Sequence, residues 1–261
     1  MTGYSDPAQM QAALDWYRSA GVDLAVLDEP VDRFAASQVA PRPAPKASAE
    51  PVVAAITLDA DPAEARSLAA SAGTLDELKA LMEAYDGCGL KLRATQICFS
   101  DGNPEADIML IGEGPGADED RIGKPFVGKA GQLLDRMLGA VGLDRTKVYI
   151  ANVVPWRPPG NREPTPQEIS ACQPFLMRQI ELVAPRIVVT VGAVSTRSLF
   201  ETTQGITRMR GQWKDLTLGT VPVKAMPMLH PAYLLRQPAA KRQAWADMLA
   251  LKKAVEGMEG R

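Results

Sequence analysis

The chain has 261 residues, of which 46% are hydrophobic and 23% charged, and its formal net charge is −2. This length and balance are typical of one globular core domain with an extension. The sequence has no apolar run near the roughly 20 residues of a membrane span and does not begin with a signal-like segment, so we expect a cytoplasmic protein without a membrane partner. The net charge excludes a chain that is basic throughout, so a nucleic-acid site would have to be a local patch.

The N-terminal part is expected to be an extension outside the core. A Ser-Asp-Pro sequence at residues 5–7 can cap a short helix that ends at Gly21. Residues 35–53 are rich in alanine, proline and serine and predict an exposed linker. We therefore divide the chain into an N-terminal helix with its linker, residues 1–60, and a core domain, residues 61–261. The protein is expected to be a monomer whose N-terminal arm could bind a protein partner.

The core alternates short apolar runs with amphipathic helical stretches. Helices are expected from residue 61 and over 74–86, the second with a capping box at its start. The alternating segments that follow are predicted as strands at 107–113, 147–154, 186–192 and 221–229 and helices at 129–143, 164–185, 193–200 and 241–257. This order predicts an α/β fold, a three-layer α/β/α sandwich with a central, mostly parallel four-stranded sheet.

Acidic residues follow the first predicted core strand in the sequence GEGPGADED. The glycine spacing differs from that of a dinucleotide turn, and acids stand where a phosphate needs neutral or positive surroundings. Glu113 and Glu119 are candidates for activating a water molecule or stabilising a cation. Asp118 and Asp120 are interpreted as the solvated face of a turn.

Further candidates follow this turn and the second strand. Phe126 could pack under the next helix or stack on a planar ligand, and its motif alone favours packing. Asn152 has a side-chain amide that can donate and accept at once, although it could also be a turn-forming asparagine. Arg157, Asn161 and Arg162 lie in the proline-rich loop PWRPPGNREP, which could bind phosphates or be an ordinary rigid loop.

The fourth strand leads into HPAYLLR, which contains His230, the only histidine of the chain. Because Pro231 follows it, we expect an extended or turning loop here and no helix. Leu234 and Leu235 form an apolar tip bounded by Arg236. Such leucines usually pack in a core, but they can also wedge into a base stack.

Together, four ordered motifs resemble the family 4 uracil-DNA glycosylases over roughly residues 81–252. They are GEGPGADED, GKPFVGKAGQLLDRML, VYIANVVPWRPPGNREPTPQEISAC and HPAYLLR. The resemblance implies a DNA repair hydrolase that flips uracil out of DNA and cleaves its N-glycosidic bond, leaving an abasic site. We expect it to be monofunctional, because no lysine in these motifs is an obvious Schiff-base nucleophile.

The resemblance also implies roles for single residues. His230 would hydrogen-bond the uracil oxygen that becomes negative, and Glu113 or Glu119 would serve the attacking water, since Gly114 stands where related families place an aspartate. The implied substrate-binding residues are Gly112, Gly114, Phe126, Asn152 and Asn161. The implied DNA-binding residues are Arg157, Arg162, Leu234, Leu235 and Arg236.

The sequence departs from the family at its cofactor. Family 4 enzymes usually hold a 4Fe-4S cluster through four cysteines. Cys88 and Cys172 match two of these positions, whereas Tyr85 and Trp156 occupy the other two, and Cys98 matches none. We therefore expect no metal and no cofactor, with Cys88 and Cys172 as remnants of the ligand set and the two aromatic rings filling the space of the cluster.

Two alternatives remain open at this stage. The chain could be a non-catalytic protein that binds uracil- or lesion-containing DNA, which the missing ligands keep possible. It could also be an enzyme on free nucleotides that uses the glycine turn for phosphate. A covalent relative carries a histidine in the loop after the asparagine strand, and its absence from PWRPPGNREP disfavours that variant.

Overall fold

The structure is a computed structural model that describes Gln11 and residues 62–259. Gln11 is helical, but the rest of the expected N-terminal helix and the linker at 35–53 lie outside the described residues. The boundary proposed between residues 60 and 61 falls there too and stays a prediction. Among the described residues, no helix is long and apolar enough to cross a membrane.

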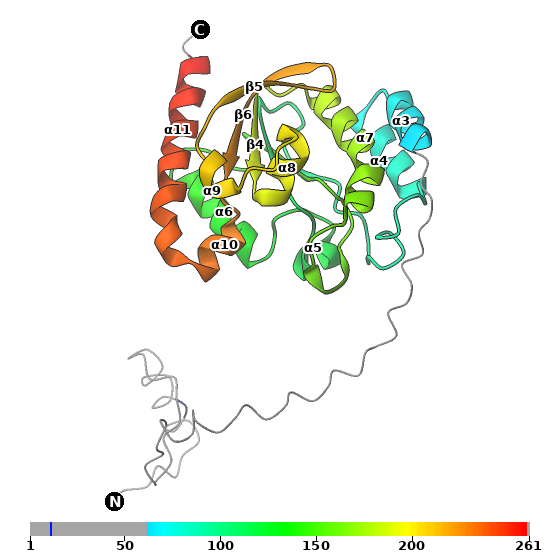
Figure 1. The fold of residues 1–261 in the computed structure, drawn as a ribbon, viewed down its shortest axis with the longest axis horizontal. Helices are drawn as coiled ribbons and strands as arrows, with labels where there is room; N and C mark the ends of the chain where they lie inside the picture. Colours follow the sequence, from blue (N-terminus) through cyan, green and yellow to red (C-terminus); the bar gives the residue numbers. More distant parts are fainter. Residues whose placement is uncertain (1–10, 12–61, 260–261) are drawn as a thin grey trace, which may run out of the picture. The chain divides into compact units, whose positions relative to one another are not determined.

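Buried strands form the centre of the core domain (Figure 1). Within the described part of the chain, the sheet has six strands in the order β1-β3-β2-β4-β6-β5. Their bounds are β1 Asp101–Gly102, β2 Ile108–Gly112, β3 Tyr149–Asn152, β4 Ile187–Val191, β5 Lys214–Leu218 and β6 Val221–Met228. The inner four strands are parallel. Every residue of β2, β3 and β4 is buried, as expected for parallel strands covered on both faces.

The prediction of a four-stranded sheet was wrong in strand number. Two antiparallel strands, β1 and β5, close the edges of the sheet. β1 has only two residues, too few for any periodic signal. β5 reads KDLTL and is mostly exposed, and such polar, exposed edges are one way in which sheets avoid pairing with other chains.

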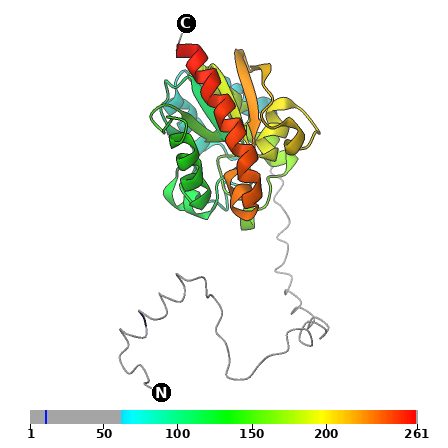
Figure 2. The same ribbon diagram turned by 90° about the vertical axis from the view of Figure 1, so that its left-hand side faces the viewer.

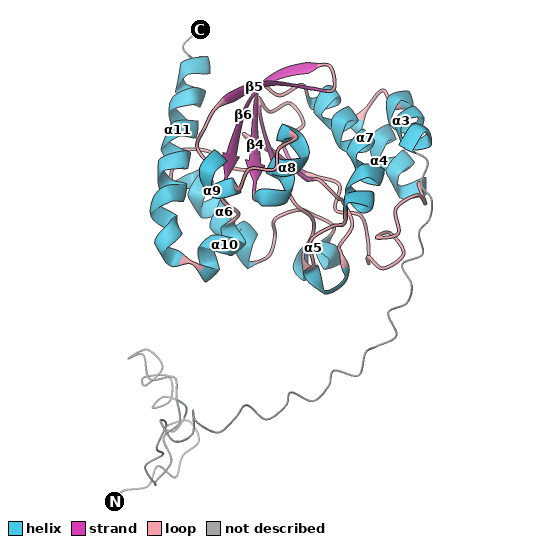
Figure 3. Ribbon diagram, in the orientation of Figure 1, coloured by secondary structure: helices cyan, strands magenta, loops and turns pink. Residues whose placement is uncertain are grey.

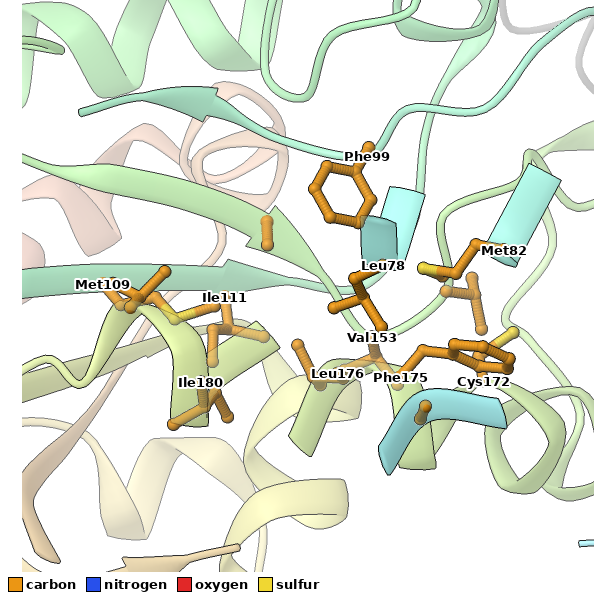
Figure 4. Packing of buried hydrophobic residues seen from close by; sticks show 14 of the residues in the cluster. Leu78, Met82, Phe99, Met109, Ile111, Val153, Cys172, Phe175, Leu176 and Ile180 are labelled. Atoms are coloured by element: carbon orange, nitrogen blue, oxygen red, sulfur yellow. The ribbon is translucent and has the colours of Figure 1, made fainter. Parts of the chain in front are cut away.

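Helices cover both faces of the sheet (Figures 1, 2 and 3). Alternate residues of β2 point to opposite faces: Met109 and Ile111 belong to one hydrophobic cluster, and Ile108 and Leu110 to the other. The first cluster includes residues of α3 (Pro62–Ser71), α4 (Leu75–Ala84), α7 (Pro166–Val183) and α8 (Ala193–Phe200), and part of it is drawn in Figure 4. The second includes residues of α6 (Lys129–Gly139) and α11 (Lys241–Glu259).

The longer helices begin where the capping residues predict. At α7, the Glu168 amide donates to Thr165 Oγ1 at 3.2 Å and the Glu168 carboxylate accepts from the Thr165 amide at 2.7 Å. Pro166 follows at the first helical position, where a proline loses no hydrogen bond. At α4, Thr74 accepts from the amide of Glu77, as its sequence predicts.

Three short helices were not predicted: α5 (Ala117–Ile122), α9 (Ile206–Met209) and α10 (Pro231–Arg236). The expectation of an irregular loop after His230 was therefore wrong. His230 is the N-cap of α10 and Pro231 its first residue, so the proline begins this helix instead of preventing it. The four inner strands end at the same edge of the sheet, and the segments that carry the candidate residues therefore converge there.

Candidate functional site

A cleft of about 640 Å³ opens at the carboxyl ends of the inner strands. Residues from six separate segments line it: the turn after β2, the segment that leads into α6, the end of β3 with its proline-rich loop, the start of α8, the start of α9, and the start of α10. Of the residues singled out in the sequence, those that line it are Glu113, Gly114, Glu119, Phe126, Asn152, Asn161, Arg162, His230 and Arg236.

Asn152 lies at the inner wall of the cleft with an unusual feature. Its side chain is buried, and its Oδ1 atom accepts no hydrogen bond from any residue that the structure describes. An unsatisfied buried acceptor costs about 1–3 kcal/mol, so it favours a ligand that can donate to it. Asn152 is paired in register with Gly112 of β2. A Cβ atom at Gly112 would lie 2.4 Å from Asn152 Oδ1 and 2.6 Å from the Phe126 ring, so only glycine leaves room for both side chains.

The Phe126 ring stacks on the His230 ring at the cleft. The two ring centroids lie 5.5 Å apart with an interplanar angle of 28°. Phe126 is buried in the hydrophobic cluster that includes residues of α6, so packing is confirmed. It also lines the cleft, and its contact with a ligand stays a prediction. Its backbone φ of 54° is in the left-handed region, which costs a non-glycine residue on the order of 1 kcal/mol.

His230 is held as a neutral hydrogen-bond donor. Its Nδ1 atom accepts from the amide of Ala232 at 3.1 Å, so the proton of the neutral ring resides on Nε2. Burial lowers the pKa of His230 to about 4, and the charge of Arg236 contributes to the decrease against a smaller opposing effect of Glu119. At neutral pH the ring is therefore uncharged, with one N–H group left to donate.

Glu113 is a half-buried acid between Gly112 and Gly114. Burial raises the pKa of its carboxyl group to about 7, and the charge of Glu163 adds to this effect while Arg197 opposes it. Glu163 and Arg197 form an ion pair of 2.9 Å. Sequence reasoning missed both, because they lie on separate segments that only the fold brings next to Glu113.

Gly114 has no room for a side chain. A Cβ atom there would lie 2.8 Å from Val154 Cγ2, closer than real contacts allow. An acid at position 114 would thus require Val154 to move. The catalytic carboxylate candidates of this turn remain Glu113 and Glu119.

Glu119 differs from Glu113 in that its carboxylate is already occupied. Oε1 accepts from the amides of Val127 and Gly128 at 2.9 and 2.8 Å, and Oε2 accepts from the amide of Gly116 at 3.2 Å. The neighbouring Asp120 corrects the interpretation of a solvated turn: it is buried and accepts from the amide and hydroxyl of Thr95. The turn is helix α5, whose first turn favours acidic side chains.

The two arginines of the proline-rich loop differ in that Arg157 is not among the residues that line the cleft. Arg157 Nε donates to Asn161 Oδ1 at 2.8 Å, which bridges the three residues between them, Pro158, Pro159 and Gly160. Arg162 lines the cleft and pairs with Glu168 at 2.6 Å, so its guanidinium is partly occupied by the cap of α7. Both arginines keep part of their surface exposed.

The structure divides the apolar residues after His230 into two groups. Leu235 is 42% exposed and Tyr233 is 38% exposed. Leu234 is buried against Leu229 and Ala244, so its assignment as a DNA-binding residue was wrong. The reason is that this segment is a helix, in which consecutive residues face different directions.

The family resemblance implies four ligand positions for an iron–sulfur cluster. These four positions lie together in the core, but packed side chains fill the space between them. Tyr85 and Trp156 are buried in the same cluster as Cys88 and Cys172, and the two sulfur atoms are 3.6 Å apart. A Cβ atom at Gly87 would lie 2.2 Å from Tyr85 Oη, so the tyrosine ring fills the space beside this glycine. No three His, Cys, Asp or Glu residues in the described part of the chain are grouped so as to hold a metal ion. These residues do not fit a cluster that needs four thiolates.

Cys98 does not complete the set. Its thiol donates to the carbonyl oxygen of Glu119 at 3.0 Å, on α5. Burial raises the pKa of Cys98 to about 12, and the charges of Asp120 and Glu119 raise it further. A thiolate ligand is therefore disfavoured at this position.

Comparison with known proteins places the cleft in a family. The model of the uracil DNA glycosylase superfamily matches residues 99–249, which include every cleft residue discussed above. A type-4 uracil-DNA glycosylase of Thermotoga maritima is 44% identical over 150 residues, 57% of this chain and 77% of the relative. The type-4 uracil-DNA glycosylase of Sulfurisphaera tokodaii is 39% identical over 69% of this chain and 84% of the relative. That of Archaeoglobus fulgidus is 37% identical over 67% of this chain and 89% of the relative.

The environment of His230 predicts its titration. Because burial disfavours the charged ring, we expect a ¹⁵N NMR titration to give a pKa near 4, with the Nε2-protonated neutral tautomer at pH 7. The chain has only one histidine, so its imidazole signals need no assignment. The urea-unfolded chain, as the control, should titrate near 6.5. Titration of the folded protein near 6.5 would contradict the geometry described here.

Proposed function

Because the chain belongs to the uracil-DNA glycosylase superfamily and within it to family 4, we propose that its cleft binds a uracil flipped out of DNA and hydrolyses the N-glycosidic bond. The product is an abasic site, the first intermediate of base excision repair. The observation that carries this proposal is the unpaired Oδ1 atom of Asn152, which lies beside the Phe126 ring and shares the cleft with His230.

Asn152 would read the base. Its Oδ1 accepts from the ring N3–H of uracil while its amide nitrogen donates to the O4 carbonyl. Cytosine presents an acceptor and a donor at the same two positions, so both contacts would become repulsive. Phe126 would stack on the base, a contact worth about 1–3 kcal/mol in single-stranded nucleic-acid binding.

His230 would stabilise the leaving group. Cleavage places negative charge on the uracil O2 atom, and the Nε2–H group of the neutral imidazole can donate to it. A neutral donor suits this task because it keeps its proton through the reaction. Loss of one such preorganised donor typically lowers kcat about 100- to 1000-fold.

Glu113 would supply the carboxylate. The deoxyribose becomes cationic as the bond breaks, and a carboxylate at the cleft can stabilise this charge and accept a proton from the attacking water. Glu119 fits this role less well, because three backbone amides occupy its oxygens. No lysine lines the cleft among the described residues, which supports hydrolysis without a lyase step.

Duplex DNA would contact the rim. Arg162 and Arg236 line the cleft and would supply positive charge for the phosphates flanking the flipped nucleotide, and Arg157, in the same loop as Arg162, would add to this charge. Leu235, exposed on α10, would enter the gap that the base leaves, while Leu234 anchors the helix in the core.

The proposal is tested with an oligonucleotide that contains one uracil, incubated with the protein and then treated with alkali. Strand scission at the uracil is expected. Retention of the oligonucleotide without scission would instead indicate a binding protein, and indifference to the DNA would favour an enzyme on free nucleotides.

The variant Asn152→Asp sharpens this assay. A carboxylate cannot donate to O4, so we expect the ratio of uracil to cytosine excision to fall. Asn103→Asp is the matched control, because Asn103 Oδ1 only accepts from the amide of Glu105 in a surface turn, a bond that a carboxylate keeps. Equal selectivity in wild type and Asn152→Asp would remove Asn152 from base recognition.

The raised pKa of Glu113 predicts the pH dependence of excision. The carboxyl group is protonated below about pH 7 and ionised above it, so the single-turnover rate should rise with pH and level off above about 7. His230 does not titrate in this range, because its pKa is about 4. The variant Glu113→Gln should be slower and lack the inflection. An inflection that persists in Glu113→Gln would assign the titration to another group.

We also propose that the enzyme works without an iron–sulfur cluster, on the ground that Tyr85 and Trp156 fill the ligand positions. Protein purified anaerobically is expected to be colourless, to contain no stoichiometric iron by chemical assay, and to excise uracil. A brown chromophore with stoichiometric iron would contradict this prediction. A parallel purification of a type-4 relative with four cysteines at these positions shows that the procedure preserves a cluster.

A further inference from the structure

The turn that carries Phe126, residues 125–128, has a backbone conformation that its sequence does not explain. Phe126 has a φ of 54° without being glycine. Its carbonyl lies so close to α6 that a Cβ atom at Gly131 would be 1.7 Å from the carbonyl oxygen. A strained conformation of this kind persists only where the surroundings fix it.

The negatively charged side chain of Glu119 binds the amides of this turn. Oε1 of Glu119 accepts from the backbone N–H groups of Val127 and Gly128. The other carboxylate oxygen of Glu119 accepts from the amide of Gly116, in the glycine turn after β2. One side chain thus fastens the Phe126 turn to the segment that carries Glu113.

The positively charged side chain of Arg145 binds the carbonyls of the same turn. The guanidinium of Arg145, in the segment between α6 and β3, donates to the carbonyl oxygens of Pro125 and Phe126. It is itself held by Asp101 at 2.6 Å and by Asp135 of α6 at 2.9 Å. Asp101 belongs to the two-residue strand β1, so this short edge strand places an anchor for Arg145.

We propose that Glu119 and Arg145 form a clamp that positions the Phe126 ring in the cleft. The carboxylate fixes the amides of the turn and the guanidinium fixes its carbonyls, so the left-handed residue between them cannot relax. This inference rests on the proposed function in one respect, namely that the Phe126 ring stacks on the flipped base. It makes Glu119 and Arg145 positioning residues that act through Phe126, without contact to the substrate.

The first test observes the ring directly and needs no activity. The protein is labelled with 4-fluorophenylalanine at its five phenylalanines, and Phe126→Leu identifies the Phe126 signal by ¹⁹F NMR. Glu119→Gln and Arg145→Lys should shift or broaden that signal, while the signals of Phe99, Phe175 and Phe200, which pack in the core, report whether the fold is intact. Arg145→Gln removes the guanidinium charge and should change the Phe126 signal more, provided that these other phenylalanine signals stay as in the wild type.

The matched controls use equivalent bonds elsewhere. Arg178 donates twice to the carbonyl of Ala72 and pairs with Glu181, and Glu77 accepts from the amide of Gly73. Arg178→Lys and Glu77→Gln should leave the Phe126 signal unchanged. An unchanged Phe126 signal in folded Glu119→Gln and Arg145→Lys would overturn the clamp, whatever the protein does to DNA.

The second test is a double-mutant cycle on uracil excision. In the wild-type background, Arg145→Lys should lower the single-turnover rate about tenfold, within the coupling seen between contacting residues. In the Phe126→Leu background the same change should cost less than about twofold, because the ring through which it acts is gone. Equal losses in both backgrounds would overturn the inference. If the wild type excises no uracil, the proposed function fails and the NMR result alone decides the clamp.

Discussion

The pairing of β2 with β3 is the constraint on which the cleft depends. The two strands are parallel and in a register that puts Gly112 beside Asn152 at their carboxyl ends. Backbone hydrogen bonds fix this register, and a slip of one residue would turn the Asn152 side chain to the other face of the sheet. Because Gly112 has no side chain, the Asn152 amide and the Phe126 ring can both lie next to it. The inner wall of the cleft is thus built on two central, fully buried strands.

Burial determines the charges of the cleft as much as residue type does. The same desolvation that keeps His230 uncharged at neutral pH raises the pKa of Glu113 to about 7. A neutral donor and a carboxylate that titrates near physiological pH suit a reaction that creates an anion on the base and a cation on the sugar. The permanent charges lie around this centre: Arg162 and Arg236 line the cleft, and Arg197 opposes the effect of Glu163 on Glu113.

The positions at which the family resemblance implies cluster ligands are part of a packed hydrophobic core. Thiolates around iron would require four cysteines with room between them for the inorganic atoms. Here Tyr85 packs on Phe175 with ring centroids 5.0 Å apart, and Trp156 lies in the same hydrophobic cluster. Large aromatic rings bury much apolar surface, which can tie the end of α4 to α7 without a metal. Cys88 and Cys172 are buried in the same core.

The sequence by itself determined the inner strands, the long helices and their caps, because periodicity and capping depend on neighbours along the chain. It also determined the residue types of the cleft, since Glu113, Asn152 and His230 stand in motifs at or near the carboxyl ends of strands. Tertiary structure alone decided the rest. The edge strands β1 and β5 are too short or too polar to be read locally, and Leu234 turned inward because α10 is a helix. The amides that occupy Glu119 are only three, eight and nine residues away from it. The closeness of Glu163 and Arg197 to Glu113, by contrast, depends on distances between segments far apart in the chain. Those distances arise only when the sheet brings the segments to one edge, because electrostatic and hydrogen-bonding interactions act through space.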